Sequence, residues 1–296
     1  MRHLKKYNII FIYLFIFNGC SSMSNFNFDK SALIEEKAIK EKELKLLSWN
    51  IKMFPAPYGW LLNRNQRANN IIQLLKESSS YDAIFFQEAF SGSIRKKIYE
   101  ALKYIYPFQV EPKDEASFYR INSGLWVISK LPITLKDDVI FSKVRETDGL
   151  ASKGAKLYTI NKGGILFNII NTHLQSDYKD KYDDIRQHQY LEIHEKLIFG
   201  KITNDPLILI GDLNIANPKK LNKMLLQLNL KNGPLLGKLK HSLVGRGKKL
   251  VDYILIDDRN LKFKSIKRKI IDSPIKFKDM ENKFSDHYPI EAKIVW

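Results

Sequence analysis

The sequence has almost no cysteine: Cys20 is the only one in 296 residues. A lone cysteine excludes an intramolecular disulfide, a thiolate metal site and a catalytic thiol from the folded part of the chain. Histidine is scarce as well, with six residues, which argues against a tetrahedral His/Cys zinc site. Internal repeats, low-complexity tracts and Pro/Gly/Ser linkers are also missing from residues 44–296, so we expect one folded domain there.

A long hydrophobic run is missing too. The mostly apolar stretch at residues 7–17 is shorter than the ~20 residues that a membrane-spanning helix needs. It follows three basic residues, and a short apolar core after a basic start is typical of an export signal. Residues 17–20, Phe-Asn-Gly-Cys, resemble a bacterial lipobox, so we expect residues 1–19 to be a lipoprotein-type signal peptide. Cys20 would carry the lipid and residues 20–43 would tether the domain to the cell envelope, while plain secretion stays open.

The sequence has few acidic residues for its number of basic ones: 49 lysines and arginines outnumber 32 acidic residues and give a formal net charge of +17. Such a surface attracts nucleic acid, anionic lipid or phosphorylated small molecules at long range, but it does not rank them. A lysine-rich genome produces the same excess without any function. With 44% hydrophobic and 27% charged residues, the composition is otherwise that of an ordinary globular protein.

Alternating and all-apolar runs predict strands, and apolar residues at helical spacing predict helices. Lys162-Gly163-Gly164 between two strand runs has the composition of a β-hairpin turn. Hairpins interleaved with helices indicate an α+β fold, a four-layer αββα sandwich of two mainly antiparallel sheets flanked by helices. The predicted strands are residues 45–50, 81–88, 124–129, 155–161, 165–173, 207–210, 251–256 and 289–295, and the predicted helices are 67–76, 93–105, 182–199 and 218–228.

Acids, amides and imidazoles fall where the apolar strands begin or end, and such positions can converge on one rim of a sheet. Each has an ordinary explanation by itself: Asp-Leu-Asn after a strand is common as a turn or cap, and a single histidine is often structural. Together they include oxygen ligands suited to a hard divalent cation and a base that could activate water. These residues are Asn50, Glu88, His173, Asp212, Asn214, Asp252, Asp286 and His287.

Six short motifs occur in one order along the chain and resemble the signatures of the endonuclease/exonuclease/phosphatase superfamily. The resemblance covers residues 44–296 and implies a two-sheet αββα sandwich with the active site at the strand ends. The motifs are Trp49-Asn50-Ile51, Phe86-Gln87-Glu88, Asn171-Thr172-His173-Leu174-Gln175, Gly211-Asp212-Leu213-Asn214, Val251-Asp252-Tyr253 and Ser285-Asp286-His287-Tyr288-Pro289-Ile290.

Three further segments, residues 151–155, 172–176 and 186–189, are similar to bacterial neutral sphingomyelinases. Those enzymes hydrolyse sphingomyelin to ceramide and phosphocholine with Mg²⁺, so the resemblance implies a phospholipid substrate at a membrane surface. It implies Mg²⁺ as the cofactor, with Mn²⁺ or Co²⁺ as possible substitutes. We expect the enzyme to act as a monomer.

The resemblance also implies roles for the strand-end residues. Glu88 would bind the metal with Asn50, and Asp286 would support the metal side of the site. His287 would take a proton from the attacking water. Asp252 would orient His287, because a hydrogen-bonded carboxylate fixes the tautomer of an imidazole and stabilises its charged form.

On the phosphate side, the resemblance implies that Asp212 holds the nucleophilic water or the leaving group. Asn214 and His173 would donate hydrogen bonds to the phosphate as its negative charge grows. Lys153 lies in a Lys-Gly step before a strand, as in the sphingomyelinases, and is a candidate for substrate binding.

One departure from haemolytic sphingomyelinases concerns the segment before Ser-Asp-His. There those enzymes carry an aromatic-tipped hairpin, whereas residues 262–284 here are basic and contain no tryptophan. Membrane contact would then come from the lipid anchor or from attraction to anionic lipid. Two alternatives stay open: a secreted Mg²⁺-dependent DNase of the same superfamily, and a cell-surface binding lipoprotein without catalysis.

Overall fold

The computed structural model describes residues 42–112, 120–177, 181–244, 247–259, 261–271 and 283–296. The predicted signal peptide, the lipidation site at Cys20 and most of the predicted tether lie outside these ranges, as does much of the basic segment before Ser285. The first strand begins at Glu43, one residue before the predicted start of the domain. In the described part of the chain, we find no helix with the length and apolar character needed to cross a membrane.

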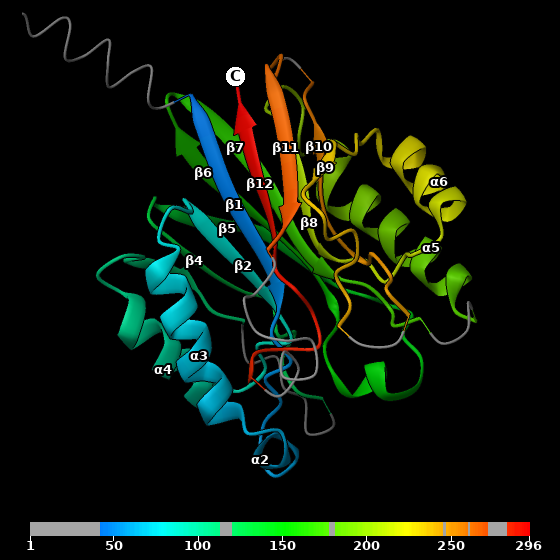
Figure 1. The fold of residues 1–296 in the computed structure, drawn as a ribbon. Coiled ribbons are helices and arrows are strands. Elements are labelled where there is room, and N and C mark those ends of the chain that lie inside the picture. Colours follow the sequence, from blue (N-terminus) through cyan, green and yellow to red (C-terminus); the bar gives the residue numbers. More distant parts are fainter. Residues whose placement is uncertain (1–41, 113–119, 178–180, 245–246, 260, 272–282) are drawn as a thin grey trace, which may run out of the picture.

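Two β-sheets face each other in the centre of the molecule (Figure 1). In chain order, their strands are β1 (Glu43–Asn50), β2 (Ala83–Gln87), β3 (Phe108–Val110), β4 (Trp126–Ser129), β5 (Ile133–Ile140), β6 (Gly154–Lys162), β7 (Ile165–His173), β8 (Leu207–Asp212), β9 (Leu235–Leu236), β10 (Asp252–Asp257), β11 (Ser265–Ile270) and β12 (Ile290–Val295). Over the described residues, the seven-stranded sheet has the order β3-β4-β2-β1-β12-β11-β9 and the five-stranded sheet the order β10-β8-β7-β6-β5. Most neighbouring strands are antiparallel, with parallel pairs at β1–β2, β7–β8 and β9–β11.

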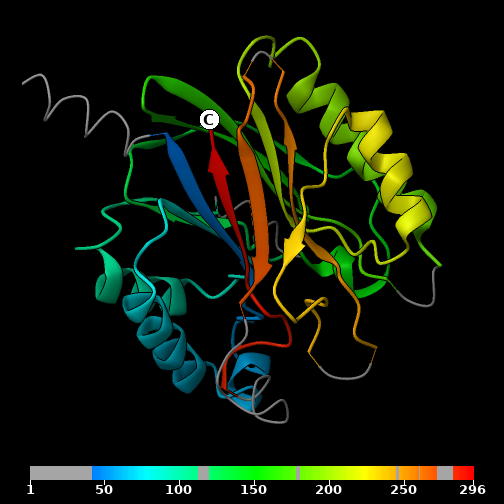
Figure 2. The same ribbon diagram turned by 45° about the horizontal axis from the view of Figure 1, so that its top comes forward.

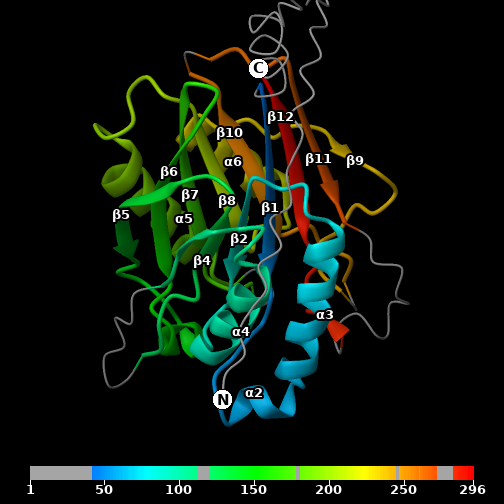
Figure 3. The same cartoon turned by 90° about the vertical axis from the view of Figure 1, so that its left-hand side faces the viewer.

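Helices cover the outer faces of both sheets. Helices α3 (Arg64–Glu77) and α4 (Gly92–Leu102) lie on the seven-stranded sheet, and α5 (Asp183–Ile193) and α6 (Pro218–Leu228) lie on the five-stranded one (Figures 1 and 2). A short helix, α2 (Tyr58–Leu61), lies beyond the end of β1 (Figure 3). This arrangement confirms the predicted α+β sandwich.

Local sequence explains several boundaries. Helix α6 starts at Pro218, whose missing amide hydrogen costs nothing at a first helical position, and the Asn217 side chain accepts a hydrogen bond from Lys219 N. The predicted hairpin is confirmed: Lys162 pairs with Ile165, so a two-residue Gly163-Gly164 turn joins β6 to β7. Both glycines have positive φ, which the favoured two-residue hairpin turns require.

Strands β3, β5, β9 and β11 were not among the predicted elements. β5 is an edge strand with only one buried residue, and its sequence ITLKDDVI carries three charges in a row. In β11, SIKRKI, the polar residues outnumber the apolar ones. Partly exposed strands like these lack the apolar run that marks a buried strand, so their pairing with neighbours decides their conformation.

The register of the strands brings the predicted site residues to one end of the sandwich. β1 and β2 are parallel and end together, with Asn50 opposite Gln87 and Glu88 one residue further. In the other sheet, His173 at the end of β7 pairs with Asp212 at the end of β8. Asp252 begins the antiparallel β10 opposite Asp212, so three site residues stand side by side on neighbouring strands.

Candidate active site

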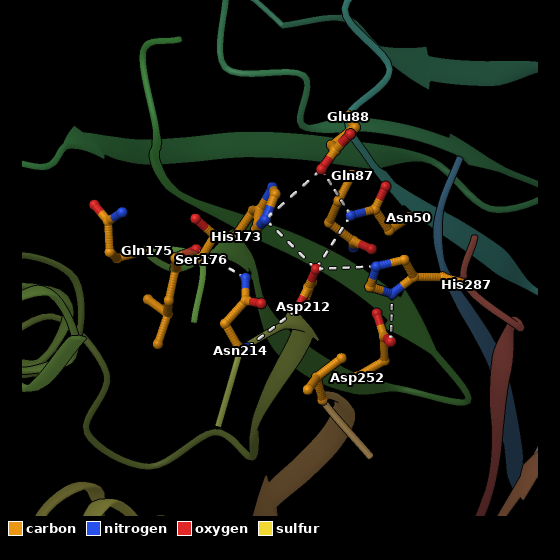
Figure 4. A network of polar contacts seen from close by, with 12 residues as sticks. Asn50, Gln87, Glu88, His173, Gln175, Ser176, Asp212, Asn214, Asp252 and His287 are labelled. Atoms are coloured by element: carbon orange, nitrogen blue, oxygen red, sulfur yellow. Dashed lines mark hydrogen bonds and ion pairs between the residues drawn. The ribbon is translucent and has the colours of Figure 1, made fainter. Parts of the chain in front are cut away.

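Apart from Asp286, the residues predicted from the strand ends form one network around Asp212 (Figure 4). Asp212 Oδ2 accepts a hydrogen bond from Asn50 Nδ2 at 3.1 Å and lies 3.4 Å from His173 Nε2 and 3.7 Å from His287 Nε2. Asp212 is 1% exposed. Two histidines therefore flank one buried carboxylate, one on each side.

On the first side, His287 is held between two carboxylates. Its Nδ1 lies 2.8 Å from Asp252 Oδ2, and its Nε2 faces Asp212. Burial opposes a charged imidazole, but the negative charges of Asp252 and Asp212 outweigh it and raise the pKa of His287. Burial and the charge of Asp252 also raise the pKa of Asp212. The positively charged imidazole, which forms when His287 takes a proton, is thus stabilised here.

The backbone around His287 is fixed by neighbours from other elements. Trp49 Nε1 donates to His287 O at 2.9 Å, and Ser285 Oγ donates to Asn50 O at 2.6 Å. Arg67 of α3, 2% exposed, donates to the carbonyl oxygens of Ile51 and Phe284, each at 2.7 Å. This buried guanidinium therefore links the loop after β1 to the segment that carries His287.

The predicted metal ligands lie beside Asp212, at the end of the seven-stranded sheet. Asn50 Nδ2 donates to Glu88 Oε1 at 3.1 Å, so the amide nitrogen faces this carboxylate. Asp286 Oδ2 accepts a hydrogen bond from Lys52 Nζ at 2.7 Å. Burial would raise the pKa of Asp286, but the charges of His287 and Lys52 lower it. Burial raises the pKa of Glu88, and the negative charge of Asp286 raises it further.

Two positions offer ligands for a cation. Ligand atoms of Asp212, Asp252 and His287 lie within 4.8 Å of one another, which makes these three buried groups able to hold a metal ion. There, however, Nδ1 of His287 already pairs with Asp252, so this nitrogen is not free to bind a metal ion. Burial, and then the like charge of Asp286, raise the pKa of Glu88, and a cation bound beside this carboxylate would offset both effects. Carboxylate oxygens are the ligands that a hard divalent cation prefers. The predicted ligands Glu88 and Asp286 therefore suit such a cation better than the Asp212, Asp252 and His287 group does.

On the second side of Asp212, His173 contacts a buried lysine. Lys153 Nζ lies 3.0 Å from His173 Nε2, 2.9 Å from Leu174 O and 3.0 Å from Asp148 Oδ1. Burial and the charge of Lys153 lower the pKa of His173 well below its usual value. The neutral ring accepts at Nε2 and carries its proton on Nδ1, which is buried without a hydrogen-bond partner among the described residues.

Asn214, the remaining predicted donor, lies two residues after the end of β8. Its Nδ2 donates to Leu174 O at 3.2 Å, and its backbone N–H donates to Asp212 Oδ1 at 3.0 Å. Asn214, Glu88 and Lys52 all have positive φ although none is a glycine. Such strained conformations cluster at functional sites, and here each one follows a strand that ends at the network.

Sequence reasoning missed Lys52, Asp148 and Arg67. Lys52 and Asp148 form ion pairs with the predicted residues Asp286 and Lys153. Lys52 follows Asn50 by two residues and Asp148 precedes the Lys-Gly step, so both lie close to motifs that were recognised. Nothing local marks Arg67, because on the helix it occupies a position that the apolar pattern assigns to the core.

The chain is similar to known proteins both in sequence and in fold. A family model described as "Endonuclease/Exonuclease/phosphatase family" matches residues 47–287. Sphingomyelinase C 2 of Leptospira interrogans is 30% identical over 206 residues, 60% of this chain and 31% of that protein. Sphingomyelinase C of Leptospira interrogans is 29% identical, with 83% of this chain and 51% of that protein covered. The chain therefore spans about a third to a half of these relatives.

Phospholipase C of Staphylococcus aureus is a relative of similar length: it is 27% identical, with 89% of this chain and 91% of that protein covered. Among solved structures, SmcL gives a TM-score of 0.73 at 23% identity, covering 86% of this chain and 99% of the other. A double-substituted beta toxin of Staphylococcus aureus with bound magnesium ions gives 0.70 at 23% identity, covering 84% and 99%. At this identity the structures establish the shared fold.

Proposed function

Because the chain belongs to the endonuclease/exonuclease/phosphatase family, we propose that it is a metal-dependent phosphodiesterase that hydrolyses sphingomyelin to ceramide and phosphocholine. The observation that carries the proposal is the pair formed by His287 and Asp252, 2.8 Å apart, beside Asp212. Relatives named sphingomyelinase C and phospholipase C support the choice of a phospholipid substrate.

In this reaction, His287 takes the proton of the attacking water, and Asp252 holds the imidazole in the tautomer that can accept it. Asp212, between the two histidines, accepts a hydrogen bond from the water and orients it. His173, Asn214 and Lys153 lie on the opposite side of Asp212, where the negative charge of the pentacoordinate phosphate develops.

A divalent cation, which we propose to be Mg²⁺, would be held by Glu88 and Asp286 with help from Asn50, and it would polarise a phosphoryl oxygen. The beta toxin structure with bound magnesium ions supports this identity for a related protein. Mn²⁺ or Co²⁺ can take the same oxygen ligands.

A DNase is the second candidate, favoured by the net charge of +17 and by the same metal and histidine chemistry. Phosphocholine release from sphingomyelin liposomes, measured with the full chain beside plasmid nicking, separates the two. We expect lipid hydrolysis that requires Mg²⁺ and stops with EDTA, without nicking. Nicking without lipid hydrolysis would transfer the substrate to DNA, and inactivity on both would favour the binding lipoprotein.

We also propose that the protein is exported and anchored through a lipid on Cys20, on the basis of the lipobox-like residues 17–20. Incorporation of labelled palmitate in a bacterial host tests this. The Cys20→Ala variant should lose the label, and a label that persists in this variant would refute the anchor. We expect the enzyme to act as a monomer, which its elution volume in size-exclusion chromatography would check.

A further inference from the structure

A cavity of about 590 Å³ opens on the His173 side of the candidate active site. Its inner end is formed by Glu88, Lys153 and His173, the groups placed near the phosphate. Away from this end the walls are mainly apolar and come from the segments after β1 and β2, from the segment before β4 and from the turn before β6. They include Phe54, Phe90, Ile121, Leu150 and Ala151.

These walls are held in place by packing and backbone hydrogen bonds. The rings of Phe54 and Phe90 have centroids 5.4 Å apart. Gly124, with φ of +68°, lets the Phe90 ring approach the backbone, since a Cβ atom there would lie 2.7 Å from it. On the other wall, Ile121 N donates to Leu150 O at 2.9 Å. The cavity is thus formed before any substrate binds, with Leu150, 62% exposed, at its rim.

The position of the cavity relative to His287 decides which part of a phosphodiester it can receive. His287 and Asp212, which act on the water, are not among the residues that line it, whereas His173 and Glu88 are. In hydrolysis of a phosphodiester, the attacking and leaving oxygens lie roughly in line on opposite sides of the phosphorus. A water held at His287 therefore directs the leaving oxygen toward the cavity.

We propose that the cavity binds the apolar chain of the leaving alcohol and thereby sets the preference of the enzyme for the length of this chain. This inference rests on the proposed function. The water oxygen bonds to phosphorus, the bond from phosphorus to the lipid oxygen breaks, His287 keeps the water proton, and solvent water protonates the released alkoxide. The ammonium of Lys153 in the cavity wall has three N–H donors, and it already contacts His173, Leu174 O and Asp148. It therefore has no donor left for the next phosphate of a nucleic acid strand.

The test uses alkylphosphocholines with alkyl chains of increasing length, assayed with the full chain below the concentration at which they form micelles. Phosphocholine release gives kcat/KM for each. Each methylene buried in the cavity should raise kcat/KM by up to about four-fold until the chain reaches the rim. A series in which chain length has no effect, although turnover occurs, would overturn the inference and leave the proposed function standing.

Leu150→Asp places a carboxylate at the rim and should remove most of the dependence on chain length. Leu226→Asp on α6 is the matched control, because Leu226 is also exposed, at 83%, and does not line the cavity. If kcat/KM depends equally on chain length in Leu150→Asp and in Leu226→Asp, the cavity has no role in binding the chain. The inference would also be refuted if Leu150→Asp changed the preference for choline over ethanolamine head groups and left the dependence on chain length unchanged. No turnover of any alkylphosphocholine or of sphingomyelin would overturn the proposed function and this inference with it.

Discussion

Asp212 lies between two histidines, His287 and His173, whose surroundings shift their pKa values in opposite directions (Figure 4). His287 and His173 are both buried, with exposures of 7% and 4%, so burial alone disfavours the charged form of each. The carboxylates of Asp252 and Asp212 reverse this effect and raise the pKa of His287. Beside the ammonium of Lys153, the pKa of His173 falls instead.

The difference shows that charged neighbours, and not burial, assign the two roles. An imidazole between carboxylates is stabilised after it takes a proton, which suits a general base. On the other side, the buried ammonium of Lys153 supplies the positive charge near the phosphate, and the imidazole of His173 beside it stays neutral. The two sides also differ in what they border, since only the His173 side opens into the apolar cavity.

The largest effect is expected on the His287 side. His287→Ala should lower kcat by a factor of about 10² to 10⁴, because a positioned general base contributes that much. Steady-state assays of phosphocholine release would measure it, with thermal unfolding to show that the fold persists. His188→Ala, on α5 outside the network, is the control and should keep normal activity. Normal turnover in His287→Ala would remove this residue from the mechanism.

Next comes the metal side. Chelation with EDTA should abolish activity, and Glu88→Gln should raise the Mg²⁺ concentration for half-maximal activity by about 10-fold or more, since one ligand charge is lost. Mg²⁺ titrations of both proteins would give the shift. If Glu88→Gln unfolds the protein, the carboxylate is structural; if its Mg²⁺ dependence is unchanged, the metal lies elsewhere, with the Asp212, Asp252 and His287 group as the next candidate.

On the His173 side, the main expected effect is on stability. Lys153→Met leaves Asp148, paired at 3.0 Å, as a largely buried carboxylate without its partner. Removing one partner of such a pair costs about 3–5 kcal/mol, less here because the Asp148 side chain remains 13% exposed. Chemical denaturation would measure the loss. Adding Asp148→Asn should restore part of it, and a double variant no more stable than Lys153→Met would show that the pair is not the cause.

The smallest effects are expected when either of two buried arginines, Arg67 and Arg95, is replaced. Arg67 holds the carbonyls of Ile51 and Phe284 near His287, whereas Arg95 of α4 holds those of Ala89 and Phe90 beside the cavity. Replacing either by Met leaves buried acceptors unsatisfied and should cost about 1–3 kcal/mol. We expect Arg67→Met to lower kcat and Arg95→Met to raise KM for long-chain substrates. The same kinetic change in both variants would mean that they act only through stability.

Much of the fold and site could be predicted because strands bury apolar runs and end in polar residues. The all-apolar run at residues 207–210 of β8 and the Gly163-Gly164 turn can be recognised from composition alone. The partly exposed β5 and β11 do not, and neither does the π-helical turn that follows α5 within the predicted helix. The domain boundaries and the role of each site residue stay predictions.

By itself, the sequence determined which residue types end the strands, and hence that four carboxylates, two amides and two imidazoles could lie close together. Only the tertiary structure decided which of them touch. Asp252 and His287 are 35 residues apart, and Asn50 and Asp212 are 162 apart, so no local pattern couples them. The strand register, the positive φ of Glu88 and the charged neighbours Lys153 and Lys52 set the distances and the pKa directions. Those quantities depend on through-space contact, which a linear pattern does not contain.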